Sequence, residues 1–371
     1  MAKKTKKEEV IDLSEFNVEQ LEKKLSEAME EEDDDMIAKI SAEKEKRENR
    51  KELVKRKFVS LQGYKDKMSI TDAKYKPQSW IDMSSAFKDA TKLPGIPECA
   101  VVVCGGLPDS GKSTVAIEAA AYAQKQGILP VFIITENKFS FERAETMGVD
   151  FDDSAIVHNG VKTIEEGCNY IKKLLDDQES GELDYDLLFI WDSVGSTPSA
   201  AELAKREDDN NSRGMMETAR VLREQIGRYL SHRVNNTRNE SYKRNATLLI
   251  VNQAYTAPPD FAGGQPKLVF YGGGGITYSA SLIMQMGGVK SASSKITAIK
   301  DGTEISFAIR TKISILKNHI TNISSTSAKI ICCDHGFLQD DKKVIEDYKK
   351  STKDGWDLNF DAKYWDGLAE L

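Results

Sequence analysis

The sequence predicts an α/β protein with a central, mostly parallel β-sheet that is flanked by helices. The first observation is a set of nearly continuous apolar runs, at residues 100–104, 131–135, 187–191 and 247–252. Strands that are buried on both faces have this pattern, and the segments between the runs read as helices. The second observation is a glycine-rich turn at residues 106–111, which lies between the first run and an alanine-rich helical segment.

Further apolar runs follow at residues 282–286, 305–316 and 329–333. We expect these runs to form a more antiparallel C-terminal portion of the same sheet. Strands and helices are expected to alternate from about residue 98 to residue 339, and the sequence shows no internal repeat.

The glycine-rich turn has the spacing of a phosphate-binding loop. Glycines at both ends let the backbone N–H groups point inward at a phosphate, beside the positive end of the following helix. In this pattern the lysine reaches the β- and γ-phosphates, and the hydroxyl after it completes the shell of a Mg²⁺ ion. A glycine turn that matches by chance is the alternative, and the strand-loop-helix context argues against it. The predicted nucleotide-binding residues are Gly106, Leu107, Pro108, Asp109, Ser110, Gly111, Lys112, Ser113 and Thr114.

Polar residues follow three of the apolar runs, and hydrolysis of a nucleotide needs such groups beside the phosphates. Asp192 ends one run and is the predicted second support of Mg²⁺, together with Ser113. Glu136 ends another and is the candidate that activates water. Gln253 follows a third run, where a neutral amide suits a sensor of the γ-phosphate. An acid that merely starts a turn is the alternative for Asp192.

Composition argues against a membrane protein and against a secreted protein. The chain has 371 residues, a formal net charge of −7, and no apolar run near the length that spans a bilayer. The basic start leads into glutamates rather than an apolar segment, so we expect no secretory signal and a cytoplasmic protein with no membrane partner. The five cysteines show no CxxC spacing and are expected to be reduced, buried and structural. A nucleic-acid site on such an acidic protein has to be local.

Charge patterning divides the chain into four predicted regions. Residues 1–57 form a charged helical N-terminal arm, in which Asn17 and Gln20 have capping-box spacing. The expected function of this arm is a contact with a neighbouring subunit, although charge blocks of this kind are more often solvated. The remaining predicted regions are a connector at 58–97, the core at 98–339, and an acidic, aromatic tail at 340–371.

In the order of these motifs the chain resembles the RecA-type recombinases, and among them it is most similar to bacterial RecA and the phage UvsX branch. The local sequence agrees at residues 144–150, 192–202 and 272–280, and the similarity covers roughly residues 79–339. The resemblance implies a RecA-like ATPase that uses ATP and Mg²⁺ and assembles into a helical homo-oligomeric filament. It also implies single-stranded DNA and homologous duplex DNA as partners, with a loader or single-strand-binding protein as a candidate partner. The implied output is strand exchange in recombination and repair, in a bacterial cell or a phage-infected host.

By this resemblance two loops face the DNA. The first runs from about 205 to 214, and its candidate contacts are Lys205, Arg206 and Arg213. The second runs from about 254 to 274 and has the glycine and aromatic content of a segment that stacks on bases. Its candidate contacts are Tyr255, Phe261, Lys267, Phe270 and Tyr271.

Two positions depart from the family pattern. The family carries paired lysines that reach the ATP of the neighbouring subunit, and here the pair is Lys317 and His319. Lys317 is therefore the stronger candidate, since the charge of a histidine depends on pH. The aromatic residue that stacks on adenine is absent, and Arg143 lies near its position.

Two other functions fit the same motifs. A ring-forming helicase of the same fold would form closed hexamers instead of open filaments. A non-catalytic mediator would bind ATP to stabilise the filament of another protein, and it would tolerate loss of Glu136. The filament-forming recombinase is the primary prediction, because every expected catalytic position is filled.

Overall fold

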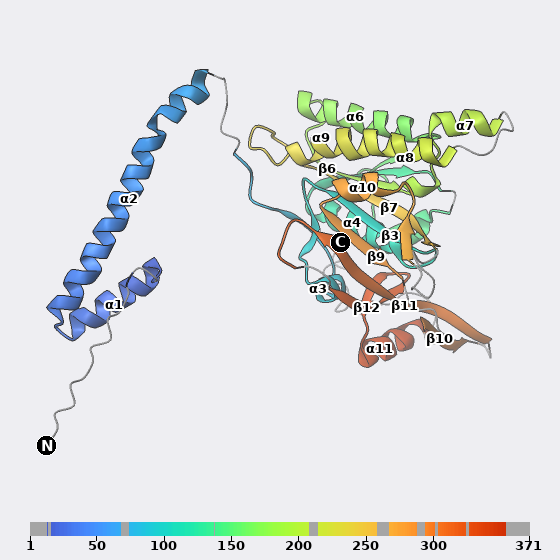
Figure 1. The fold of residues 1–371 in the computed structure, drawn as a ribbon. Coiled ribbons are helices and arrows are strands. Elements are labelled where there is room, and N and C mark those ends of the chain that lie inside the picture. The colour runs from blue at the N-terminus through green and yellow to red at the C-terminus, as the bar shows by residue number, and fades with distance from the viewer. Residues whose placement is uncertain are drawn as a thin grey trace. The chain divides into compact units, whose positions relative to one another are not determined.

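The computed structural model describes residues 13, 16–67, 74–136, 138–207, 214–257, 267–287, 294–300, 303–323 and 326–353. Its contacts divide the chain into two compact units, one up to Ala73 and one from Lys74 onward (Figure 1).

The first unit is a pair of helices, α1 (Val18–Glu30) and α2 (Asp34–Lys67). Helix α1 begins with the predicted capping box, in which Asn17 accepts from the Gln20 N–H and the Gln20 side chain accepts from the Asn17 N–H. This reciprocal pair satisfies two donors that a helix start leaves open. The helices share a small apolar cluster, and its buried members are Leu13, Leu21 and Ile40.

Helix α2 extends past the predicted end of the arm at residue 57. It continues to Lys67, and the compact unit that contains it extends to Ala73. Part of the predicted connector also belongs to the second unit. There, strands β1 (Trp80–Asp82) and β2 (Gly95–Pro97) pair around the short helix α3 (Ser85–Thr91) and contribute buried residues to the main core.

The second unit is built on one large sheet, which confirms the predicted fold class. Its strands lie in the order β13-β12-β11-β9-β3-β7-β6-β4-β5, with β10 paired to β11 and β8 to β7. The pairs from β9 to β5 are parallel, and the pairs from β9 to β13 are antiparallel, as expected for the C-terminal portion. The main strands are β3 (Val101–Gly106), β4 (Ile128–Ile134), β5 (Ile156–His158), β6 (Asp186–Asp192), β7 (Ala246–Ala257), β9 (Leu282–Met286), β11 (Thr303–Asn318) and β12 (Ser327–Cys333).

Helices cover both faces of this sheet because its central strands are apolar on both sides. Val102 and Cys104 of β3 belong to the cluster on one face, where α4 (Lys112–Lys125) and α5 (Phe141–Thr146) pack. Val101 and Val103 belong to the cluster on the other face. That face is covered by α6 (Ile164–Ser180), α8 (Gly214–Glu224), the π-helical turn η3 (Gln225–Leu230), α9 (Ser231–Asn236) and α10 (Gly274–Ser279).

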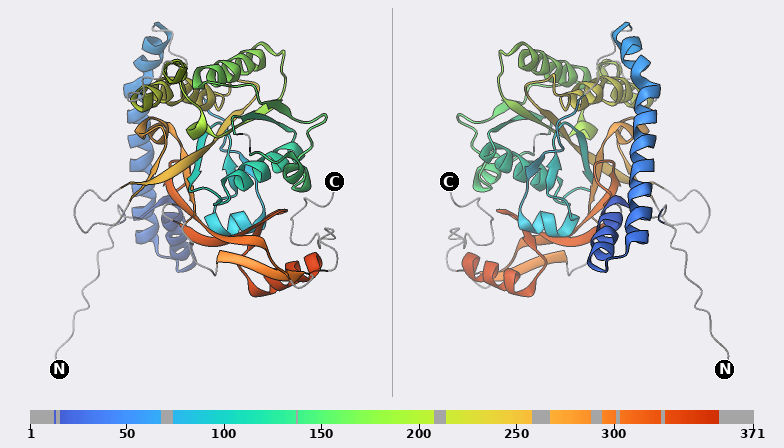
Figure 2. Two further views of the ribbon diagram at one scale, coloured as in Figure 1. Left: turned by 90° about the vertical axis from the view of Figure 1, so that its right-hand side faces the viewer. Right: turned by 90° about the vertical axis from the view of Figure 1, so that its left-hand side faces the viewer.

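The antiparallel end of the sheet has its own small core. Strands β10 (Lys295–Lys300) and β13 (Gly336–Gln339) and helix α11 (Lys342–Lys353) enclose it, and Tyr348 of α11 is buried there. In Figures 1 and 2 this orange-to-red end lies away from the green and yellow helices α6 and α8. The predicted tail therefore starts as a packed helix, and its residues beyond 353 lie outside the described part.

The sequence also led to expectations about the cysteines and about membrane-spanning segments. All five cysteines are free and buried, as expected. No helix in the described part of the chain has the length and apolarity needed to cross a bilayer.

Candidate functional site

The glycine-rich turn joins the end of β3 to the start of α4. A side chain at Gly106 would put its Cβ 2.2 Å from the carbonyl oxygen of Met286. Gly111 has a φ of +94°, a conformation that favours glycine. Both glycines are thus required by the geometry of this loop, whose N–H groups lie at the beginning of a helix.

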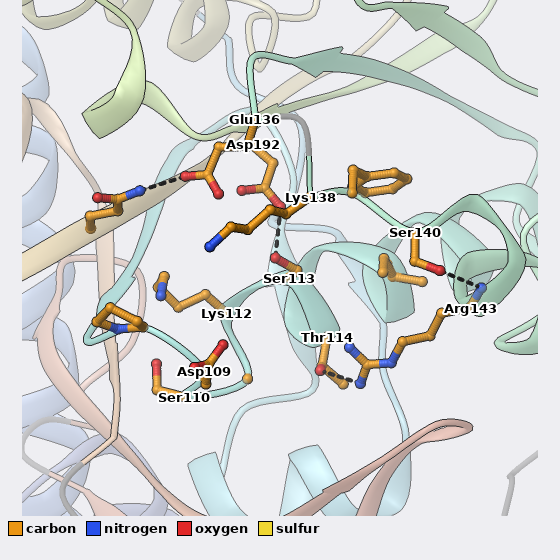
Figure 3. Close-up of a pocket in the computed structure, with 15 residues that line it drawn as sticks. Asp109, Ser110, Lys112, Ser113, Thr114, Glu136, Lys138, Ser140, Arg143 and Asp192 are labelled. Carbon is orange, nitrogen blue, oxygen red and sulfur yellow. Dashed lines mark hydrogen bonds between the residues drawn. The ribbon is translucent and has the colours of Figure 1, made fainter.

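The loop forms one wall of a cavity of about 430 Å³ (Figure 3). The ends of three parallel strands form the opposite wall, because β4, β6 and β7 all point their carboxyl ends at the same sheet edge. The cavity is lined by Pro108, Asp109, Ser110, Gly111, Lys112, Ser113, Thr114, Ile117, Glu136, Lys138, Phe139, Ser140, Arg143, Asp192 and Gln253.

A hydroxyl and a carboxylate meet at the start of α4. The Ser113 Oγ donates to the Asp192 Oδ2 at 2.8 Å. Burial raises the pKa of the Asp192 carboxyl to about 6, and the nearby Glu136 charge also raises it, while the Ser113 hydrogen bond and Lys112 lower it. The described residues contain no cluster of three or more acidic, cysteine or histidine ligands. Two oxygen ligands from the protein, completed by phosphate oxygens and water, fit Mg²⁺, which rarely uses an all-protein cage.

Glu136 lies just past the end of β4 and is held by two neighbours. The Gln253 Nε2 donates to the Glu136 Oε1 at 2.6 Å. The Ser193 hydroxyl donates to the same carboxylate oxygen. These contacts fix the orientation of the carboxylate at the cavity wall.

Two cations at the cavity have different partners. The Lys112 ammonium donates to the carbonyl of Leu107 at 2.7 Å, so it folds back over the loop. The Arg143 guanidinium donates to the Thr114 hydroxyl at 2.9 Å and to the carbonyl of Cys333 at 3.0 Å. Arg143 therefore lies at the opposite end of the cavity from Glu136 (Figure 3).

The main chain after Gln253 connects this cavity to a β-hairpin. Strand β7 continues to Ala257 and pairs with β8 (Lys267–Phe270). The carbonyl of Gln253 accepts from the N–H of Tyr271 at 3.0 Å, and the Asn252 side chain donates to the Tyr271 carbonyl at 2.8 Å. The two ends of the second predicted DNA loop, residues 254–257 and 267–270, are therefore the paired strands of a hairpin.

The aromatic residues of this hairpin point in different directions. Tyr255 and Tyr271 are exposed, and their rings contact each other edge to face at 5.2 Å. Phe270 instead packs inward, where a Cβ at Gly105 would lie 2.3 Å from its ring. Phe270 is half-buried and packs against the apolar cluster on one face of the sheet. Its predicted contact with DNA therefore stays a prediction.

The other predicted DNA contacts are only partly described. Lys205 is exposed on α7 (Ala200–Glu207), and Arg206 lies on the same helix, with its side chain outside the described set. Lys267 begins β8, and its side chain is likewise outside that set. Arg213 and Phe261 lie outside the described residues altogether.

Lys317 is not among the residues that line the cavity. Its ammonium donates to the carbonyls of Thr277 and Tyr278 at 3.0 and 2.7 Å, at the end of α10. Partial burial lowers the pKa of this lysine. His319 is exposed on the chain just after β11.

A second cavity, of about 750 Å³, lies between α8–η3 and the glycine-rich turn before α10. Its cations were not predicted from the sequence, although arginines that recur on one helix beside four consecutive glycines are a recognisable signal. Arg220 forms ion pairs with Glu217 and Glu224. The lining includes Arg220, Arg223, Arg228, Gly272, Gly273, Gly274, Gly275 and Tyr278.

The backbone of this second cavity is unusually close to the helix beside it. A Cβ at Gly275 would lie 2.6 Å from the Cβ of Arg223, and a Cβ at Gly227 would lie 2.9 Å from the Gly275 carbonyl oxygen. Gly227 lies in the π-helical turn η3, a feature often found at functional sites. The structure thus places Arg223 directly beside the half-buried backbone of Gly275.

The parallel sheet, the phosphate loop at its switch to α4, and the acids at the strand ends define an α/β protein of the phosphate-loop class. The family model of the RecA N-terminal domain matches residues 63–336. The chain belongs to the RecA family.

Among curated relatives, Protein RecA of Desulforapulum autotrophicum is 29% identical over 241 residues, which cover 64% of this chain and 60% of the relative. Protein RecA of Mycobacterium ulcerans is 28% identical over 276 residues, which cover 74% of this chain and 71% of the relative. The alignments therefore leave a substantial part of each relative uncovered.

Proposed function

We propose that this protein is an ATP-dependent DNA recombinase that forms helical filaments on single-stranded DNA and promotes strand exchange with homologous duplex DNA. One observation carries the proposal. Gln253 contacts Glu136 at the nucleotide cavity with its side chain and Tyr271 of the hairpin with its main chain. A single residue thus joins the candidate hydrolytic group to the candidate DNA-binding hairpin, and membership of the RecA family supports the same assignment.

The cavity residues have distinct roles in this proposal. The N–H groups of the loop and Lys112 bind the phosphates of ATP, and Ser113 and Asp192 would hold Mg²⁺. Bound Mg²⁺ would neutralise charge on the β- and γ-phosphates. Glu136, oriented by Gln253 and Ser193, positions the attacking water and accepts its proton.

Single-stranded DNA is proposed to lie along the hairpin and the second cavity. Arg223 and Arg228 supply cations for phosphate oxygens, and the glycine backbone beside them lets a strand approach closely. The exposed rings of Tyr255 and Tyr271 have the character of a base-stacking surface. ATP favours the DNA-bound state through its contact with Gln253, and hydrolysis weakens that state.

Electron microscopy of the full chain tests this function directly. With a non-hydrolysable ATP analogue and poly(dT), we expect open helical filaments of variable length. Closed hexameric rings would support the helicase instead, and particles that do not assemble would support the mediator. Steady-state assays should also show ATP hydrolysis that is stimulated by poly(dT), and this stimulation should weaken steeply with salt because phosphate contacts release counterions.

A further inference from the structure

Lys138 is a cation at the nucleotide cavity that the roles above do not use. It lies two residues after Glu136, in the segment that leads from β4 to α5, and it is among the residues that line the cavity. In Figure 3 its side chain points into the cavity, toward the end that carries Lys112, Glu136 and Asp192 and away from Arg143.

The segment that carries Lys138 is anchored on both sides. Before it, Glu136 is bonded to Gln253 and Ser193. After it, the ring of Phe139 packs edge to face on Phe132 of the core at 5.7 Å. These anchors limit how far the backbone at residue 138 moves, so the long side chain starts from a defined point beside the carboxylates.

The other two cations that line the cavity form hydrogen bonds to other protein groups. Lys112 belongs to the phosphate loop, and Arg143 is bonded to Thr114 and the Cys333 carbonyl at the far end. Lys138 makes no ion pair within 4.0 Å to an acidic group of the described residues, although it shares the cavity with Glu136 and Asp192. Its ammonium group is therefore available to an anion that enters the cavity.

We propose that Lys138 is a catalytic residue that contacts the γ-phosphate of ATP and stabilises the transition state of hydrolysis. This inference rests on the proposed ATPase function. It adds a second lysine of the same chain, besides Lys112, that would contact the phosphates in this cavity.

The reaction step is a displacement at phosphorus. The oxygen of water forms a bond to the γ-phosphorus, and the bond from that phosphorus to the bridging oxygen breaks. The electron pair leaves on ADP, and Glu136 accepts the proton of the water. Lys138 keeps its own protons, and its charge offsets the negative charge that spreads over the γ-phosphate oxygens in the transition state.

The test compares Lys138→Ala and Lys138→Arg with Lys162→Ala, a control that removes an exposed lysine outside the cavity. Steady-state ATP hydrolysis is measured with saturating poly(dT), and binding of ADP is compared with binding of ADP plus aluminium fluoride, which mimics the transferring phosphoryl group. Because Lys138 is exposed, both variants are expected to fold, and circular dichroism melting checks this.

We expect Lys138→Ala to lower kcat roughly tenfold to a hundredfold, somewhat less than loss of a rigid oxyanion donor because the lysine stem is flexible. The KM should stay within about threefold of wild type, since the contact with the γ-phosphate is much stronger in the transition state than in bound ATP. ADP plus aluminium fluoride should bind more weakly while ADP alone is unaffected. Lys138→Arg should recover part of the rate, and Lys162→Ala should match wild type.

A kcat of Lys138→Ala within about threefold of wild type would overturn the proposal, and so would a change confined to KM. Equal weakening of ADP with and without aluminium fluoride would overturn it as well. Wild-type protein that does not hydrolyse ATP with poly(dT) would instead refute the proposed function. The two failures are therefore distinguishable in one set of assays.

Discussion

Replacing Gln253 with alanine should uncouple ATP binding from DNA binding. The substitution removes the 2.6 Å hydrogen bond to the Glu136 carboxylate and leaves the main-chain bond to Tyr271 in place. A hydrogen bond to a charged group contributes about 1.5–3 kcal/mol. This energy sets an upper bound on how strongly the contact can couple the two ligands, if the contact differs between the nucleotide-free and the ATP-bound protein. The bound corresponds to an increase in DNA affinity of about 10- to 150-fold when ATP binds, and the variant should lose this increase.

Fluorescence anisotropy of labelled oligo(dT) measures this coupling, as the ratio of the Kd values without and with a non-hydrolysable ATP analogue. The matched control is Gln285→Ala, which removes an amide of β9 that does not line the nucleotide cavity. We expect the ratio to fall toward one in Gln253→Ala and to stay unchanged in Gln285→Ala. An unchanged ratio in Gln253→Ala would refute the reasoning that this contact transmits the nucleotide state.

Glu136→Gln should lower ATP turnover about 10²- to 10⁴-fold because it removes the proton acceptor, while a fluorescent ATP analogue still binds; turnover close to wild type would mean that Glu136 is not the group that activates water, and recombination activity that survives the loss of turnover would favour the mediator. Arg223→Ala should weaken DNA binding to a similar extent for all sequences and reduce the slope of log K against log salt by about one unit, as measured by a salt titration; an unaltered slope would place the phosphates elsewhere. Burial lowers the pKa of His335, whose ring contacts Tyr348, so the unfolded chain binds a proton first as pH falls. The free energy of unfolding should therefore decrease as pH falls through about 6.5, and His335→Asn should flatten this dependence in urea titrations; equal slopes in both proteins would contradict the assignment.

Local sequence pattern was sufficient for much of the fold. Continuous apolar runs indicated strands buried on both faces, and β3, β4, β6 and β7 have that pattern because helices cover both sides of the sheet. The capping box at Asn17 was readable for a similar reason, since its two hydrogen bonds join residues three apart. Short strands such as β5 were not predicted, because three residues carry too little periodicity.

The sequence by itself determined which chemical groups this protein brings to its phosphate loop. Glycine spacing dictates the turn, and an acid or amide after a buried parallel strand must lie at the carboxyl edge of the sheet. Only the tertiary structure decided how those groups contact one another. The Gln253–Glu136 bond, the inward ring of Phe270, and the direction of Lys138 depend on strand order and on packing between segments far apart in the chain. Periodicity along one segment carries no information about such neighbours, because it records which face is buried and not what lies against it.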